Sequence, residues 1–194
     1  MSDRAAEKKV HIVECARTVF IKKGYKDVTM KDIVDACDIS RGGLYIYFDS
    51  IKELFEAVLE AEEKKSDSEV TRKLPSVKNS VDILTLFFKE QKKEIMKRHD
   101  SLLTAIYEYA FINANLKHPV KSVYTKQTAK SEMFLSKLIE NGNKTGEFSV
   151  EEPKQTAKHV VYALEGMKIM NRAGKLSERD IDDELYRLMA TIIE

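Results

Sequence analysis

Apolar residues recur every three or four positions along almost the whole chain, which is the spacing of amphipathic helices. In the first such stretch Ile12, Ala16 and Phe20 share one face and Gly24 follows, so we expect a helix over about residues 5–23. No sustained alternation of apolar and polar residues, the pattern of a strand, interrupts this series. The sequence therefore predicts an all-α fold of about nine helices.

The stretch from Thr29 to Phe48 predicts two short helices joined by a tight turn. Thr29 suits a helix N-cap, and Asp32 three residues later completes a pair that resembles a capping box. Ser40 suits the N-cap of the second helix, which carries Leu44 and Phe48 on one face. Two capped helices so close together predict a helix-turn-helix.

The second helix of this pair begins with residues that do not favour a helix. Gly42 and Gly43 follow Arg41 in its first turn, where each glycine costs about 1 kcal/mol relative to alanine. A turn without side chains lets the backbone and Arg41 approach another surface closely. Because the first residues of a recognition helix contact base edges, we expect this helix to read DNA.

The order of residues through this region resembles the DNA-binding domain of the tetracycline-repressor (TetR) family of bacterial regulators. The resemblance covers roughly the first 60 residues. It is carried by Ile12-x-x-x-Ala16-x-x-x-Phe20-x-x-x-Gly24-Tyr25, Thr29-Met30-x-x-Ile33, Ile39-Ser40-x-Gly42-x-Leu44-Tyr45-x-Tyr47-Phe48 and Ser50-x-Lys52-Glu53-Leu54. It implies a transcriptional regulator, usually a repressor that a small-molecule effector releases from its operator.

The resemblance and the helix-turn-helix pattern together give a set of candidate DNA-binding residues. Arg41 is the candidate for base reading, because arginine suits the paired acceptors of guanine. Members of the family commonly carry lysine where Ile51 stands, and the neighbouring Lys52 is the candidate for that phosphate contact. The full set is Thr29, Lys31, Ser40, Arg41, Gly42, Gly43, Tyr45, Tyr47 and Lys52.

The rest of the chain is expected to form a helical domain for effector binding and dimerisation. We expect a helix-turn-helix domain over residues 1–49, a connecting helix over 50–65 and the second domain over 66–194, with a loop or frayed helix end over residues 66–78 at the boundary. The resemblance implies a homodimer through the last two helices, which would place two recognition helices on one palindromic operator. The expected later helices are about 81–97, 101–116, 119–141, 154–172 and one capped by Ser177, with a turn at 142–148.

Aromatic and thioether side chains in the second domain predict a pocket for a small hydrophobic effector. Each of them, taken alone, is more typical of an ordinary helical core. The candidate lining residues are Phe88, Tyr107, Phe111, Gln127, Phe134, Tyr162 and Met167.

Composition adds limits to this picture. The 194 residues are 43% hydrophobic and 34% charged, with a formal net charge of only +1, so any basic surface for nucleic acid must be local. The first ten residues lack the apolar core of a signal peptide, and no run approaches the roughly 18 apolar residues of a membrane span. We expect a cytoplasmic protein that does not contact a membrane.

The cysteines and histidines predict neither a metal site nor catalysis. Cys15 and Cys37 each lie on the apolar side of a predicted helix as small core residues, with a redox switch as the alternative. His11 and Cys15 are spaced for two metal ligands, but no further ligand completes a set. Without a catalytic constellation or a glycine-rich phosphate loop, we expect no enzyme activity and no cofactor. The remaining alternative is a helical protein-interaction module that keeps the helix-turn-helix without binding DNA.

Overall fold

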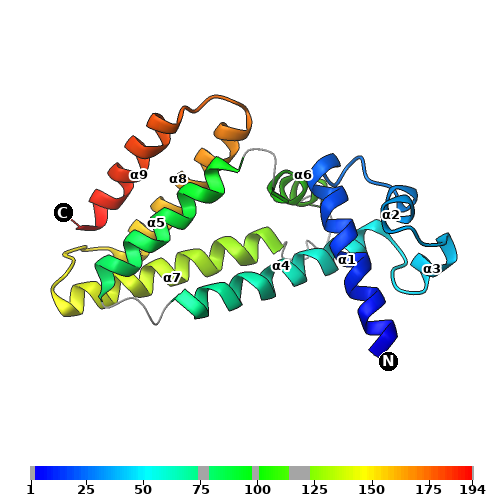
Figure 1. Cartoon of the computed structure of the whole chain (residues 1–194). Coiled ribbons are helices and arrows are strands. Elements are labelled where there is room, and N and C mark those ends of the chain that lie inside the picture. The colour runs from blue at the N-terminus through cyan, green and yellow to red at the C-terminus, as the bar shows by residue number, and fades with distance from the viewer. Residues whose placement is uncertain (1–2, 74–78, 98–100, 114–122, 194) are drawn as a thin grey trace. The chain divides into compact units, whose positions relative to one another are not determined.

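The computed structural model describes residues 3–73, 79–97, 101–113 and 123–193. Within these ranges the chain forms nine helices and no strand (Figure 1), which confirms the predicted all-α fold. None of the helices in the described ranges has the length and apolar character needed to span a membrane. By packing, the chain divides into two compact units, one of Met1–Thr71 with His99–Tyr124 and one of Arg72–Arg98 with Thr125–Glu194.

The first unit contains five helices, all but the end of one lying inside it. They are α1 (Asp3–Lys23), α2 (Met30–Cys37), α3 (Arg41–Tyr45), most of α4 (Ile51–Lys73) and α6 (Leu103–Asn113). Helix α1 packs against both α2 and α6. The apolar faces that the sequence predicts for α1 and α2 are buried in this core, with Ile12, Phe20 and Ile33 completely covered.

Four aromatic rings tie three helices and a turn together inside the first unit. Phe20 of α1 packs edge-on against Phe55 of α4 at 4.7 Å between ring centroids. Tyr25, in the turn after α1, packs edge-on against Tyr109 of α6 at 5.0 Å. Pairs in this geometry contribute about 0.5–1.5 kcal/mol each beyond the area they bury, so the cluster holds α6 firmly to the unit.

A carboxylate from α6 also satisfies the backbone of the turn between α1 and α2. The N–H groups of Tyr25 and Lys26 both donate to Glu108 Oε2, at 2.7 and 3.0 Å. Gly24 makes this approach possible, since its φ of +78° is left-handed and a Cβ there would lie 2.5 Å from the same oxygen. Helix α6 is therefore built into the first unit although the sequence separates it from α4.

The second unit contains α5 (Ser80–Met96), most of α7 (Val123–Thr145), α8 (Pro153–Arg172) and α9 (Glu178–Ile193). Helix α5 packs against α8 and α9, and α8 also packs against α9. The amide of Asn171, buried on α8, donates to the carbonyl of Ile95 at 2.7 Å and satisfies the open end of α5. As predicted, Pro153 opens α8 and Ser177 precedes α9, where its hydroxyl accepts from the N–H of Asp180.

Two predicted boundaries were wrong. The helix expected to end near residue 65 continues as α4 to Lys73, and the turn expected from Gly142 begins only after Thr145. Gly142 lies inside α7 because the ring of Phe148 folds back over it and fills the space that a Cβ would occupy, at 2.0 Å. Pro119, the expected start of α7, lies outside the described residues. The functional division at residues 49 and 66 stays a prediction, because the compact units describe packing alone.

Replacing Glu108 by alanine is expected to lower the free energy of unfolding by about 1–3 kcal/mol, because the partly buried N–H of Tyr25 and the exposed N–H of Lys26 lose their acceptor. Urea unfolding followed by circular dichroism measures the change. Glu7→Ala, at an exposed glutamate of α1, is the control and should be neutral. Equal stability of the two variants would show that water replaces Glu108 without loss.

Candidate nucleic-acid interface

A reciprocal cap fixes the start of α2. The N–H of Asp32 donates to Thr29 Oγ1 at 3.3 Å, and the N–H of Thr29 donates to Asp32 Oδ2 at 2.8 Å. This arrangement confirms the capping box that the sequence predicts. The ammonium of Lys23, in the last turn of α1, pairs with the other oxygen of Asp32 at 2.5 Å. The end of α1 and the start of α2 are therefore joined through one carboxylate.

The turn from α2 to α3 depends on two residues with special roles. Asp38 ends α2 in a left-handed conformation with φ of 51°, and its side chain is exposed. Ser40 then accepts a hydrogen bond from the N–H of Gly43 at 3.1 Å and starts α3, as predicted. A helix-turn-helix results, with α3 in the position of the recognition helix.

Helix α3 has five residues, fewer than a helix reaching Phe48 would need. Leu44 and Phe48 are both buried in the first unit, which fixes one side of this segment against the core. Arg41 and Gly42 consequently face solvent, and no atom lies within 4 Å of the place where a Cβ of Gly42 would stand. The first turn of α3 is thus an open surface that another molecule can approach closely.

The candidate DNA-binding residues predicted from the sequence fall into two groups by exposure. Thr29, Lys31, Ser40, Arg41, Gly42 and Tyr45 are exposed, while Gly43, Tyr47 and Lys52 are half-buried. The guanidinium of Arg41 lies 5.7 Å from the ring centroid of Tyr45, a cation–π contact that orients it. Their contacts with DNA stay a prediction.

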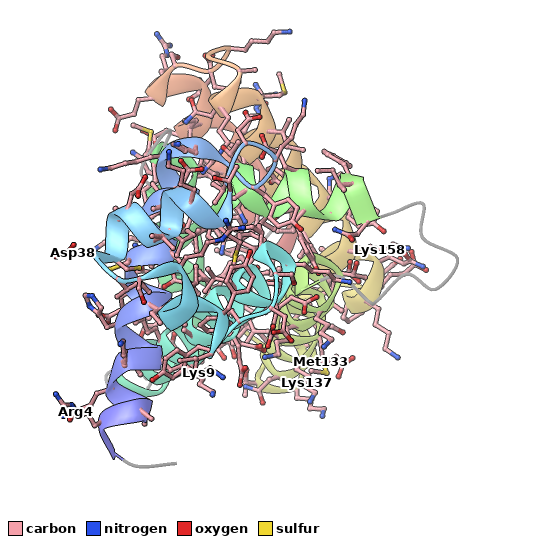
Figure 2. The ribbon with its side chains drawn as sticks, turned by 90° about the vertical axis from the view of Figure 1, so that its right-hand side faces the viewer. Arg4, Lys9, Asp38, Met133, Lys137 and Lys158 are labelled. Atoms are coloured by element: carbon pink, nitrogen blue, oxygen red, sulfur yellow. The ribbon has the colours of Figure 1, made fainter. Side chains whose placement is uncertain are left out.

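The structure adds residues that the motif does not include. Ile46 follows α3 and is 78% exposed, a position from which an apolar side chain suits a thymine methyl group. The ammonium of Lys8 lies 4.0 Å from the Cβ position of Gly43, and that of Lys9 lies 5.3 Å from the ring centroid of Phe48. Figure 2 shows Arg4 and Lys9 along the N-terminal part of α1. The sequence signal that could have indicated Lys8 is its spacing from Ile12, since a residue one turn before a core residue of α1 lies on the same side of that helix.

A small cleft in the second unit is lined by residues of α5, α7 and α8. Glu165 and Lys168 form an ion pair of 2.7 Å there, and both side chains are largely covered, with 16% and 14% exposed. Gln91 and Ser131 add polar groups to this cleft. The complete lining is Phe87, Gln91, Ser131, Val161, Leu164, Glu165 and Lys168.

The predicted effector-binding residues are not among those that line this cleft, and their role stays a prediction. Phe88 and Met167 are buried in the core of the second unit, whereas Gln127, Phe134 and Tyr162 are exposed. Tyr107 and Phe111 belong to α6 and hence to the first unit. Among the described residues no group of three or more His, Cys, Asp and Glu is arranged to hold a metal ion.

The described helix-turn-helix and the helical second unit define a class of helical transcriptional regulators, and comparison with known families specifies which one. Residues 12–58 match the model of bacterial regulatory proteins of the tetR family, and residues 83–179 match that of the tetracyclin repressor-like C-terminal domain. The chain belongs to the TetR family of transcriptional regulators, as the resemblance in its sequence predicts.

Several known proteins are similar to this chain over most of its length. It is 28% identical to the uncharacterized regulator YfiR of Bacillus subtilis over 77% of this chain and 72% of YfiR. It is 23% identical to the regulator QacR of Staphylococcus aureus over 87% and 88%. A solved Saccharomonospora viridis regulator in complex with choline is similar in fold, with a TM-score of 0.84 at 18% identity over 97% of this chain and 99% of that one.

The cap of α2 makes a pH-dependent prediction. Hydrogen bonds from Lys23 and Thr29 lower the pKa of Asp32 from 3.8 to about 2. A depressed pKa means that the carboxylate stabilises the fold above pH 3.8 and that this stability is lost as the pH falls towards 2. Asp32→Ala should therefore cost about 1 kcal/mol near neutral pH, and the difference from the parent should shrink across that window.

Thermal unfolding of the two proteins across the acid range measures this difference. Asp35→Ala, at an exposed carboxylate of the same helix, serves as the control and should follow the parent at every pH. A constant gap between Asp32→Ala and the parent down to pH 2 would contradict the assignment.

Proposed function

We propose that this protein is a repressor that binds a palindromic operator as a homodimer and is released by a small-molecule effector. The single observation that supports DNA reading best is the open first turn of α3. Arg41 and Gly42 are exposed there while Leu44 anchors the same helix in the core. An arginine so placed suits the two acceptors on the major-groove edge of guanine.

The surrounding residues suit the sugar-phosphate backbone. Lys31 and Ser40 are exposed beside α3, Lys52 is in the first turn of α4, and Lys8 lies near Gly43. Contacts of this kind position a protein on DNA but carry little sequence information. The formal net charge of +1 makes this local group important, and two copies on one operator would double it.

Exposed apolar residues on α8 and α9 support dimerisation through the last two helices. Tyr162 and Ile169 are seven residues apart on α8 and are 60% and 47% exposed, and Tyr186 and Ile193 are seven apart on α9 and are 72% and 39% exposed. Residues seven apart lie on one side of a helix, so each helix presents an apolar stripe to solvent. Stripes of this kind are typical of surfaces that another chain covers.

The effector part of the proposal needs a pocket larger than the one described in the second unit. The cleft beside Glu165 and Lys168 has about 180 Å³ of empty space, whereas ligand pockets usually have about 300–1,000 Å³, so an effector would have to part α5, α7 and α8 to bind there. The S. viridis regulator of similar fold holds choline, a small cation with an apolar shell. If the effector lowers the affinity of the protein for DNA, then DNA must lower its affinity for the effector by the same factor.

The alternative is a helical interaction module that keeps the helix-turn-helix without binding DNA, and the near-neutral charge favours it. The two functions differ in their dependence on salt. Binding to duplex DNA through several phosphates should weaken steeply as the salt concentration rises. A protein partner held by the apolar stripes of α8 and α9 would show little such dependence.

Selection of bound sequences from random duplex DNA tests the proposed function directly. The parent protein should enrich a palindrome, and Arg41→Ala should lose about 1–3 kcal/mol of affinity with relaxed preference at one base pair of each half-site. Asp35→Ala, at an exposed residue of α2, is the control and should keep the sequence preference of the parent. Uniform weakening on every sequence would instead make Arg41 a phosphate contact, and no enrichment at low salt would favour the interaction module.

A charge placed on α9 tests the dimer. Tyr186→Glu should convert the protein to a monomer at micromolar concentration, because an ionised side chain is costly to bury in an apolar interface. Sedimentation velocity gives the mass. Met133→Glu, at an apolar residue of α7 that is 55% exposed, is the control and should leave the mass unchanged. A Tyr186→Glu variant that stays dimeric would exclude this part of α9 from the interface.

A further inference from the structure

The two cysteines of the chain meet at the junction of α1 and α2. Cys37, the last residue of α2, is only 5% exposed, and its thiol lies 4.0 Å from the carbonyl oxygen of Ile12 on α1. Cys15 follows Ile12 by one turn of the same helix and packs against the same core. Burial and a hydrogen bond with the Cys15 thiol raise the pKa of Cys37 to about 12. The two cysteines therefore lie at the same stretch of α1, around Ile12, although the sequence places them on different helices.

The surroundings of the two thiols differ. Cys15 is half-buried, and its sulfur lies 3.7 Å from Nε2 and 4.0 Å from Nδ1 of His11, which is exposed. Solvent and an imidazole that can accept a proton thus both reach Cys15. Cys37 is covered and stays protonated at neutral pH. The arrangement separates an accessible thiol that can react first from a covered thiol that can react second.

We propose that Cys15 and Cys37 form a redox-active pair that a hydroperoxide converts to a disulfide. The Cys15 thiol gives its proton to His11 or water, and the thiolate attacks the peroxide oxygen. The O–O bond breaks, the sulfur loses two electrons, and Cys15 becomes a sulfenic acid while an alcohol or water leaves. Cys37 then attacks this sulfur, the S–S bond forms, and the sulfenic oxygen leaves as water with the proton of Cys37.

The position of Cys37 connects this chemistry to α3. Asp38, the next residue, holds the left-handed turn, and Ser40 caps α3 two residues later. A disulfide requires a sulfur separation of about 2.05 Å and a fixed dihedral angle, which two free thiols do not have. Closing the bond pulls the end of α2 towards α1 and displaces the start of α3. Affinity for the operator should fall about tenfold or more, as when one base contact is lost.

Hydrogen peroxide and cumene hydroperoxide are the probes, applied to the full-length reduced protein. The expected result is an intact mass lower by two hydrogen atoms, one peptide pair linked through Cys15 and Cys37, and complete reversal by dithiothreitol. In Cys37→Ala the sulfenic acid should accumulate on Cys15 and be trapped by dimedone, whereas Cys15→Ser should leave Cys37 reduced. Because the parent protein carries the mass and peptide measurements, a variant that folds poorly does not weaken the test.

Three results would refute the proposed redox pair. The first is that both thiols stay reduced under excess peroxide, and the second is that Cys37 is oxidised in Cys15→Ser. The third is a disulfide that joins two chains. The DNA measurement rests on the proposed function, and the thiol measurement does not. Reduced protein that binds no duplex therefore refutes the proposed function alone, while a disulfide that leaves operator affinity unchanged refutes the regulatory role.

Discussion

The arrangement of the first unit depends on two backbone N–H groups that need an acceptor. Tyr25 and Lys26 lie in the turn after α1, where helical hydrogen bonding has ended, and Glu108 satisfies both from α6. An N–H that loses its acceptor in a half-buried place costs free energy, so the carboxylate stabilises this conformation of the turn. This turn leads directly to Thr29, the N-cap of α2, and α2 leads to α3. The surface that is proposed to read DNA is thus fixed in part by a residue far along the chain.

Local chemistry made the helix-turn-helix predictable from the sequence. Thr29, Asp32 and Ser40 act within three residues of themselves, and the structure contains the capping hydrogen bonds that their spacing predicts. Burial of Ile12, Ile33 and Leu44 likewise follows from helical periodicity alone. The family assignment rested on the same local pattern and is confirmed.

Features that depend on distant contacts could not be predicted in this way. Glu108 meets Tyr25 across 83 positions, and nothing in the residues around Glu108 marks it as a capping group. The turn expected at Gly142 was wrong because the glycine accommodates the ring of Phe148 within a helix, whereas glycine in a sequence ordinarily indicates a turn. The cleft near Glu165 could not be predicted, because its most distinctive feature is a covered ion pair, and Glu and Lys three residues apart on a helix ordinarily indicate an exposed face.

The open space around Gly42 has a consequence for how this protein could diverge. At most positions of a recognition helix a substitution affects both the base that is preferred and the stability of the fold, because the new side chain must also fit the core beside it. At Gly42 a Cβ meets no atom within 4 Å, and the backbone there is helical. Any side chain added at this position would project into solvent, with helix propensity favouring most replacements over glycine. A single substitution at this position could therefore change what the first turn of α3 contacts without first gaining stability elsewhere.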